Sequence, residues 1–166
     1  MSVSQGIAAE WEQETASTRR ALERVPPESL DWRPHEKSYS MGELASHIAN
    51  LPVWTRMTLH QDELDLATLG GPMPAYPTKD EILEAFDRNV GDALDAIRST
   101  PEEAWPATWS LTNAGDVIFA LPRIGAMRSF IMNHSIHHRG QLTVYLRQCG
   151  APVPQIYGPT ADEPNF

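Results

Sequence analysis

Apolar residues recur at intervals of three and four in four separate stretches of this 166-residue chain. That spacing gathers them along one side of an α-helix, so each stretch has a face to bury only if it is helical. The pattern predicts four long helices, over about residues 3–24, 40–60, 78–100 and 122–149. A fold built mainly from long helices follows from this feature alone.

The ends of the predicted helices carry their own signals. Ser40 with Glu43, and Thr78 with Glu81, match the capping box, in which two side chains reciprocally satisfy free backbone N–H groups at a helix start. Pro52 lies inside the second apolar pattern. Because proline lacks the N–H group that a helix needs, we expect it to kink this helix or to end it early.

The connection between the third and fourth helices, residues 99–122, has no helical stripe. Two of its runs, ATWSL and GDVIFAL, fit either the strands of a hairpin or a simple extended crossover. Four long helices joined in this way predict an all-α fold: an up-down four-helix bundle with a long crossover between helices 3 and 4. With no internal repeat or change of composition, residues 1–166 are expected to form a single domain.

Charge and composition exclude several classes of protein. The formal net charge of −9 argues against nucleic acid, whose phosphates attract basic surfaces. No apolar run approaches the roughly 20 residues of a membrane span, and residues 1–14 lack the basic and apolar regions of a secretory signal. We therefore expect a cytoplasmic protein with no nucleic acid or membrane partner.

Three of the six histidines fall within residues 134–138. His134 and His138 lie one turn apart on the apolar stripe of the last predicted helix. His137 points about 100° away from His138 and is the alternative to it as a ligand at the i+3 spacing from His134. His47 lies on the apolar stripe of the second helix. Three neutral imidazoles that face one another can hold a divalent metal ion and leave a position open. The alternative from spacing alone is that these histidines are hydrogen-bonded core residues without a metal.

The other candidate residues are weaker. We interpret Arg139 as an ion-pair partner. We interpret Cys149, the single cysteine, as a packing residue, because Cys149 continues the apolar stripe at the negative end of a helix. The tail residues Asp162 and Glu163 could orient a ligand histidine. No acidic residue has a spacing that compels a general-base role, so the catalytic residues stay unassigned. The aromatic candidates for a pocket lining are Trp54, Tyr145 and Tyr157.

Several motifs resemble those of the DinB family. They are HSIHHRGQ at 134–141, LTVYLR at 142–147, VPQIYGP at 153–159, SMGELASHI at 40–48 and WRPHEKS at 32–38. The resemblance covers most of the chain and implies a four-helix bundle with one divalent metal ion held by His47, His134 and His138. It favours Zn or Ni, with Fe or Mn as alternatives, and it predicts a homodimer.

Function is less constrained than fold. The resemblance implies a metal-dependent enzyme that acts on a small-molecule substrate, either a thiol S-transferase using a low-molecular-weight thiol or a hydrolase-like relative. In such a transferase the metal would hold the thiol as thiolate, the reactive nucleophile. The alternative is a non-catalytic metal or small-molecule binding protein linked to stress response. The native metal, the thiol and the substrate are not specified by the sequence.

Overall fold

The computed structural model describes residues 2–165 and shows a mixed α/β fold, about 58% helical. The helical segments are α1 (Val3–Glu23), α2 (Met41–Asn50), α3 (Val53–His60), α4 (Lys79–Ser99), α5 (Arg123–Ala126), the π-helical turn η4 (Met127–Met132) and α6 (Asn133–Gln148), with short 3-10 turns at Pro27–Ser29, Leu66–Thr68 and Glu102–Ala104. None of the helices within residues 2–165 is long and apolar enough to cross a membrane.

The predicted helix ends are largely confirmed. At α2 the Ser40 hydroxyl accepts the Glu43 N–H, and the Glu43 carboxylate accepts the Ser40 N–H at 2.6 Å. At α4 the Thr78 hydroxyl accepts the Glu81 N–H, although the reciprocal bond to the Thr78 backbone is not formed. Pro52 stands between α2 and α3 and separates them, as its missing N–H group requires.

A three-stranded mixed sheet makes the all-α prediction wrong. Strand β1 (Glu63–Asp65) pairs in parallel with β2 (Thr108–Asn113), which pairs antiparallel with β3 (Asp116–Pro122). Ala114 and Gly115, with φ of 51° and 87°, form the tight turn between β2 and β3. Burial alternates along the first half of β2, which packs Trp109 and Leu111 against the helices. The hairpin alternative for residues 99–122 is therefore the right one.

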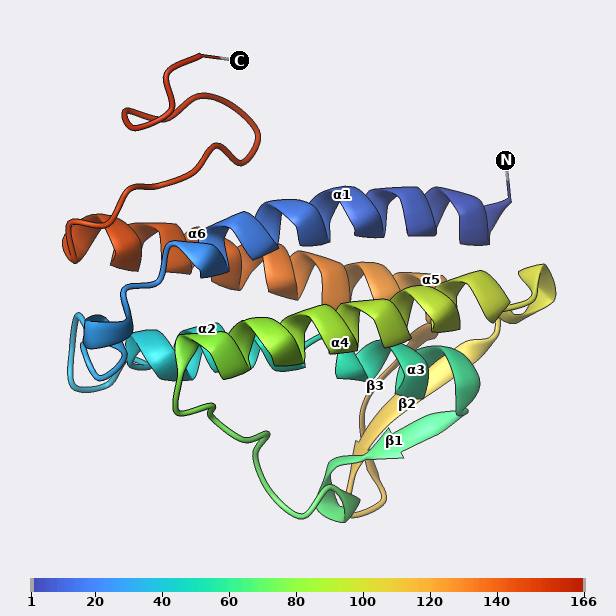
Figure 1. Ribbon diagram of the computed structural model, residues 1–166. Helices are drawn as coiled ribbons and strands as arrows, with labels where there is room; N and C mark the ends of the chain where they lie inside the picture. Colours follow the sequence, from blue (N-terminus) through green and yellow to red (C-terminus); the bar gives the residue numbers. More distant parts are fainter. Residues whose placement is uncertain (1, 166) are drawn as a thin grey trace.

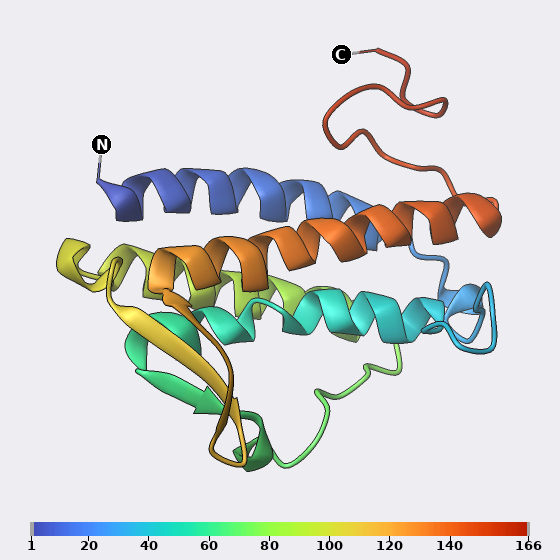
Figure 2. The same ribbon diagram turned by 180° about the vertical axis from the view of Figure 1, so that it is seen from behind.

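The long crossover also lies elsewhere than predicted. Residues 61–78 run from the end of α3 back along the helix layer to the start of α4, so α2, α3 and α4 point the same way (Figures 1 and 2). The connection predicted as the crossover instead leaves the end of α4, forms the β2–β3 hairpin and re-enters at α5 on the same side. The bundle prediction failed because β1 is only three residues long and left no periodic signal.

The interior forms three apolar clusters that together support this arrangement. One lies where α1, α2, α4 and α6 meet, a second lies near the hairpin end of the helices, and a third lies under the sheet. Their members include Leu22, Ile48, Phe86 and Leu146 in the first, Trp11, Ile97, Trp105 and Ile131 in the second, and Trp109 and Leu111 in the third. Helices α2 and α6 pack against each other at the first cluster, which fixes their facing sides.

The C-terminal segment, residues 151–165, extends beyond α6 and is held by side-chain contacts (Figure 1). Asp162 pairs with Arg147 and accepts the Val153 N–H at 2.9 Å. Glu163 pairs with Arg24, which directly follows α1, at 2.8 Å. These contacts join the tail to both α1 and α6.

Candidate metal centre

Three histidines from two helices converge at one place. His47 comes from α2, and His134 and His138 come from successive turns of α6. The Nε2 atoms of His47 and His134 are 3.5 Å apart, and one ring nitrogen from each of the three residues lies within 4.8 Å of the others. The ring centroids of His47 and His138 are 4.5 Å apart. The structure therefore brings together the three residues that the stripes of the second and fourth predicted helices placed face to face.

The donor set suits a divalent metal ion. Two imidazole nitrogens bound tetrahedrally to zinc at roughly 2.0–2.1 Å lie about 3.3–3.5 Å from each other. The His47–His134 nitrogen pair, at 3.5 Å, already has this separation. The remaining pairs all lie within 4.8 Å, so they would have to close by at most about 1.5 Å to reach it. All three rings are partly buried, so a position beside them stays accessible to a small molecule.

The surroundings keep the three imidazoles neutral, which is the form that binds a metal. Burial, and to a smaller extent charge repulsion from the neighbouring His138 and His134, lowers the pKa of His47 to about 4. Burial is also the main cause that lowers the pKa of His134 and of His138. At neutral pH each ring therefore has an unprotonated nitrogen free to donate its lone pair.

Hydrogen bonds on the far side of two rings fix which nitrogen is free. His138 Nδ1 lies 2.7 Å from the Gln141 Oε1 atom, and His134 Nδ1 lies 3.3 Å from the Phe130 carbonyl. Because both oxygens accept, each Nδ1 carries the proton and each Nε2 has the lone pair. Gln141 thus bonds within its own helix.

A π-helical turn precedes the two histidines of α6. In η4 the N–H of Asn133 bonds to the carbonyl of Arg128, five residues back, in place of the four-residue step of an α-helix. Such a turn changes the angular position, around the helix axis, of the residues that follow it. Turns of this kind are frequent at functional sites. The helix predicted over 122–149 is therefore continuous but not uniform.

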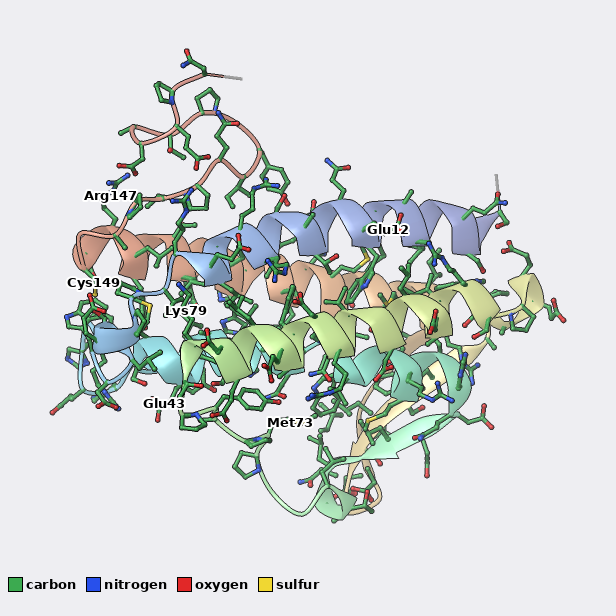
Figure 3. All side chains as sticks on the ribbon, viewed as in Figure 1. Glu12, Glu43, Met73, Lys79, Arg147 and Cys149 are labelled. Carbon is green, nitrogen blue, oxygen red and sulfur yellow. The ribbon has the colours of Figure 1, made fainter. Side chains whose placement is uncertain are left out.

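A pocket of about 430 Å³ opens beside the cluster, between α2 and the segment of residues 72–75. His47 is part of its wall, with Tyr39, Glu43, Leu51 and Trp54. Figure 3 shows Glu43 and Met73 on this same side of the helix layer. Of the three aromatic residues predicted to line a pocket, Trp54 is part of this lining, whereas Tyr145 packs edge-on against Trp32.

The segment that closes this pocket is hydrogen-bonded to α2. Asn50 Nδ2 donates to the Pro74 carbonyl at 2.9 Å, and the Tyr76 hydroxyl donates to Asn50 Oδ1 at 2.8 Å. The Tyr76 N–H donates to Ser46 Oγ at 2.9 Å. These bonds satisfy the polar side chains of α2 that face the segment.

Among the pocket residues that sequence reasoning missed, Glu43 is the one with a carboxylate. It lies one turn before His47 on α2, a spacing that could have revealed it, but its match to the capping box explained it fully. Its carboxylate accepts the Ser40 N–H and lies 3.5 Å from Arg33. The side chain is therefore engaged at the start of the helix.

The remaining candidates lie outside the cluster. His137 is exposed and stands beside the ring of His138 without joining the group of three nitrogens. The suggestion that Asp162 and Glu163 orient a ligand histidine is wrong, because both are bound to arginines of the helices. Cys149 lies at the end of α6 (Figure 3), packed against the first core cluster.

The interpretation of Arg139 as an ion-pair partner is confirmed. Its side chain is 2% exposed, and its Nη2 lies 2.8 Å from Glu14 Oε2 on α1. Nη2 also donates to the Tyr157 hydroxyl at 2.7 Å, and that hydroxyl donates to Glu14. This arrangement joins α6, α1 and the tail and accounts for Tyr157, which the sequence suggested as a pocket residue.

The helix layer, its small mixed sheet and the histidine cluster define a small α/β protein with a potential metal centre. The model of the DinB family matches residues 1–165, and the chain belongs to that family. An uncharacterized protein of Bacillus subtilis, YrdA, is 29% identical over 154 residues, which are 92% of this chain and 87% of that protein.

Two solved structures share the fold at low sequence identity. A DinB-like protein from Bacillus cereus superposes with a TM-score of 0.72 at 22% identity, over 92% of this chain and 97% of that one. A mycothiol-dependent maleylpyruvate isomerase superposes with a TM-score of 0.55 at 14% identity, over 92% of this chain and 65% of that one.

Proposed function

We propose that His47, His134 and His138 bind a divalent metal ion and that the protein is a metal-dependent enzyme acting on a small molecule. The observation that carries the proposal is the convergence of three neutral imidazoles, with ring nitrogens within 4.8 Å of one another. A core histidine needs one hydrogen-bond partner, and nothing in packing alone requires three imidazoles to meet. Zn or Ni suits this donor set best, with Fe or Mn as alternatives.

The chain's own residues prepare the site for that ion. Three neutral ligands would leave a bound divalent ion with its full charge, and such an ion would lower the pKa of a bound thiol or water and so favour the thiolate or hydroxide. Gln141 and the Phe130 carbonyl hold the rings of His138 and His134 in the tautomer that presents Nε2. The pocket beside His47 gives a small molecule access to the same position.

A thiol-dependent S-transfer is the reaction that we favour. The relationship to a mycothiol-dependent enzyme motivates it, although the shared property there is the fold. The second candidate is a non-catalytic metal or small-molecule binder. The observation in favour of this binder is that Glu43, the one carboxylate in the described lining of the pocket, is already engaged by Ser40 and Arg33 and so is not free to act as a general base. We further propose that the protein works as a homodimer, which light scattering would test.

Metal content measured on four alanine variants tests the site. The protein should be purified without a nickel column and compared at equal purity by elemental analysis. Single changes to alanine at His47, His134 or His138 should each sharply reduce the metal content, because each removes one of three ligands. His137→Ala is the matched control and should bind metal as the parent does. Equal metal content in all four variants would sink the proposal.

The reaction class needs a second measurement. Cobalt-substituted protein should develop a near-ultraviolet charge-transfer band when 2-mercaptoethanol is added, if the open position accepts a thiol as thiolate. His137→Ala should develop the same band. A fully loaded protein that shows no band at any thiol concentration would favour the non-catalytic binder.

A further inference from the structure

A second hollow adjoins the pocket beside His47. It also measures about 430 Å³, and it lies on the side of the sheet, where Leu66, Leu69 and Gly71 line it. The two hollows share Trp54 and the segment of residues 72–74 as walls. Each alone has the size of a small-molecule site.

The walls of both hollows are mainly apolar. Leu51, Trp54 and Met73 contribute to the first, and Trp54, Leu66 and Leu69 to the second. The polar groups near the first hollow are mostly occupied, since Asn50 and Ser46 hold the segment of residues 72–76. Among the residues described as lining the two hollows, Glu43 is the one with a charged side chain, and its carboxylate is bound to Ser40. Away from the metal site at His47, a charged ligand group would find no free counter-charge along either hollow, and burial without one is costly.

We propose that these two hollows bind one neutral, elongated, apolar small molecule. One end lies against His47 in the first hollow, and the body passes Trp54 and Met73 into the second. The proposal rests on the proposed function for the role of the site, because it names the class of substrate whose reactive end would meet the metal. Trp54 offers an aromatic face along the path, and Met73 offers an adaptable thioether.

Binding of N-phenyl-1-naphthylamine, a neutral fluorescent probe, to the full-length protein as purified tests this directly. We expect saturable binding, with Met73→Glu weakening it at least about tenfold because a carboxylate would be placed against the apolar body. Val117→Glu is the matched control: it adds the same charge at an exposed position of β3, 63% accessible, and should bind as the parent does. Circular dichroism confirms that the variants are folded.

Displacement of the probe by straight-chain alcohols tests the extension into the second hollow. Each added methylene that is buried should raise affinity about fourfold, so octanol should bind about 60-fold better than pentanol. Leu69→Glu, which alters the second hollow alone, should weaken octanol and spare pentanol. The same loss for both alcohols, or no loss, would overturn the extended site.

These measurements separate this proposal from the metal site. His134→Ala should still bind the probe, because His134 is not part of either described lining. A protein that binds metal but shows no saturable probe binding would refute the apolar site alone. A protein that binds the probe normally but holds no metal would refute the metal centre alone. Probe binding that neither Met73→Glu nor Leu69→Glu weakens would also overturn the proposal.

Discussion

Acidification should destabilise the metal-free protein through its histidine cluster. Burial, with a smaller contribution from the charges of His138 and His134, lowers the pKa of His47 from 6.5 to about 4. The unfolded chain therefore binds a proton at this ring at a pH where the folded protein does not. Stability is fully present above about pH 6.5, falls as the pH drops toward 4, and levels off below that value. His134 and His138 shift in the same direction and add to the loss.

The size of the effect follows from the shift at His47. A lowering from 6.5 to about 4 corresponds to roughly 3 kcal/mol at about 1.4 kcal/mol per pKa unit. Because the ring is only partly buried, solvent screening should reduce this to about 2 kcal/mol. Rather more than half of that should be lost by pH 5, which gives about 1 kcal/mol from this one residue.

Urea unfolding in the presence of a chelator, at pH 7.5 and pH 5.0, measures this loss. His47→Gln should reduce the difference in unfolding free energy between the two pH values by about 1 kcal/mol, because glutamine does not titrate. His35→Gln, at an exposed site outside the cluster, should leave the difference unchanged. Carboxylates such as Asp65 and Glu102, whose pKa values are lowered by backbone N–H groups, contribute equally to parent and variants. An unchanged pH dependence in His47→Gln would refute the reasoning.

Other changes test the supporting contacts. Glu14→Ala should lower the free energy of unfolding by about 3 kcal/mol, because it leaves the buried guanidinium of Arg139 unpaired; a loss below about 1 kcal/mol in urea, as for an exposed pair, would contradict this. Gln141→Ala should weaken metal binding roughly tenfold to a hundredfold by releasing His138 Nδ1, as measured by chelator competition, and Gln141→Glu should restore it. Cys149→Ala should leave the thiol-induced band of the cobalt protein intact, and loss of that band with full metal content would show that Cys149 is more than packing.

The helices were predictable because their signals are local. The box formed by Ser40 and Glu43 begins α2 as expected, and Pro52 separates α2 from α3. The β2–β3 hairpin was one of two alternatives that the sequence offered, whereas β1 was not predictable, because it pairs with β2 across more than forty residues of chain. Three residues of strand leave no periodicity of their own, and only the partner strand makes them a strand. The long crossover between α3 and α4 was not predicted for the same reason, because β1 lies within it.

The histidine cluster was visible because it lies on stripes that helical geometry already defines. His47, His134 and His138 required only that the two stripes face each other. The pocket was less visible, since it depends on how residues 72–76 return along α2 through Asn50 and Tyr76. Hydrogen bonds between a loop and a distant helix have no signature in spacing.

The π turn η4 sets the rotational phase of the histidines of α6. A helix with five-residue hydrogen-bond steps accommodates about one more residue than a regular α-helix over the same length. If this turn became regular at unchanged chain length, α6 would rotate by about 100° against α5. His134 and His138 would then turn away from His47, and Arg139 would leave Glu14. Deleting one residue between Met127 and Met132 would restore the regular form and the phase together, so the extra residue and the π turn depend on each other.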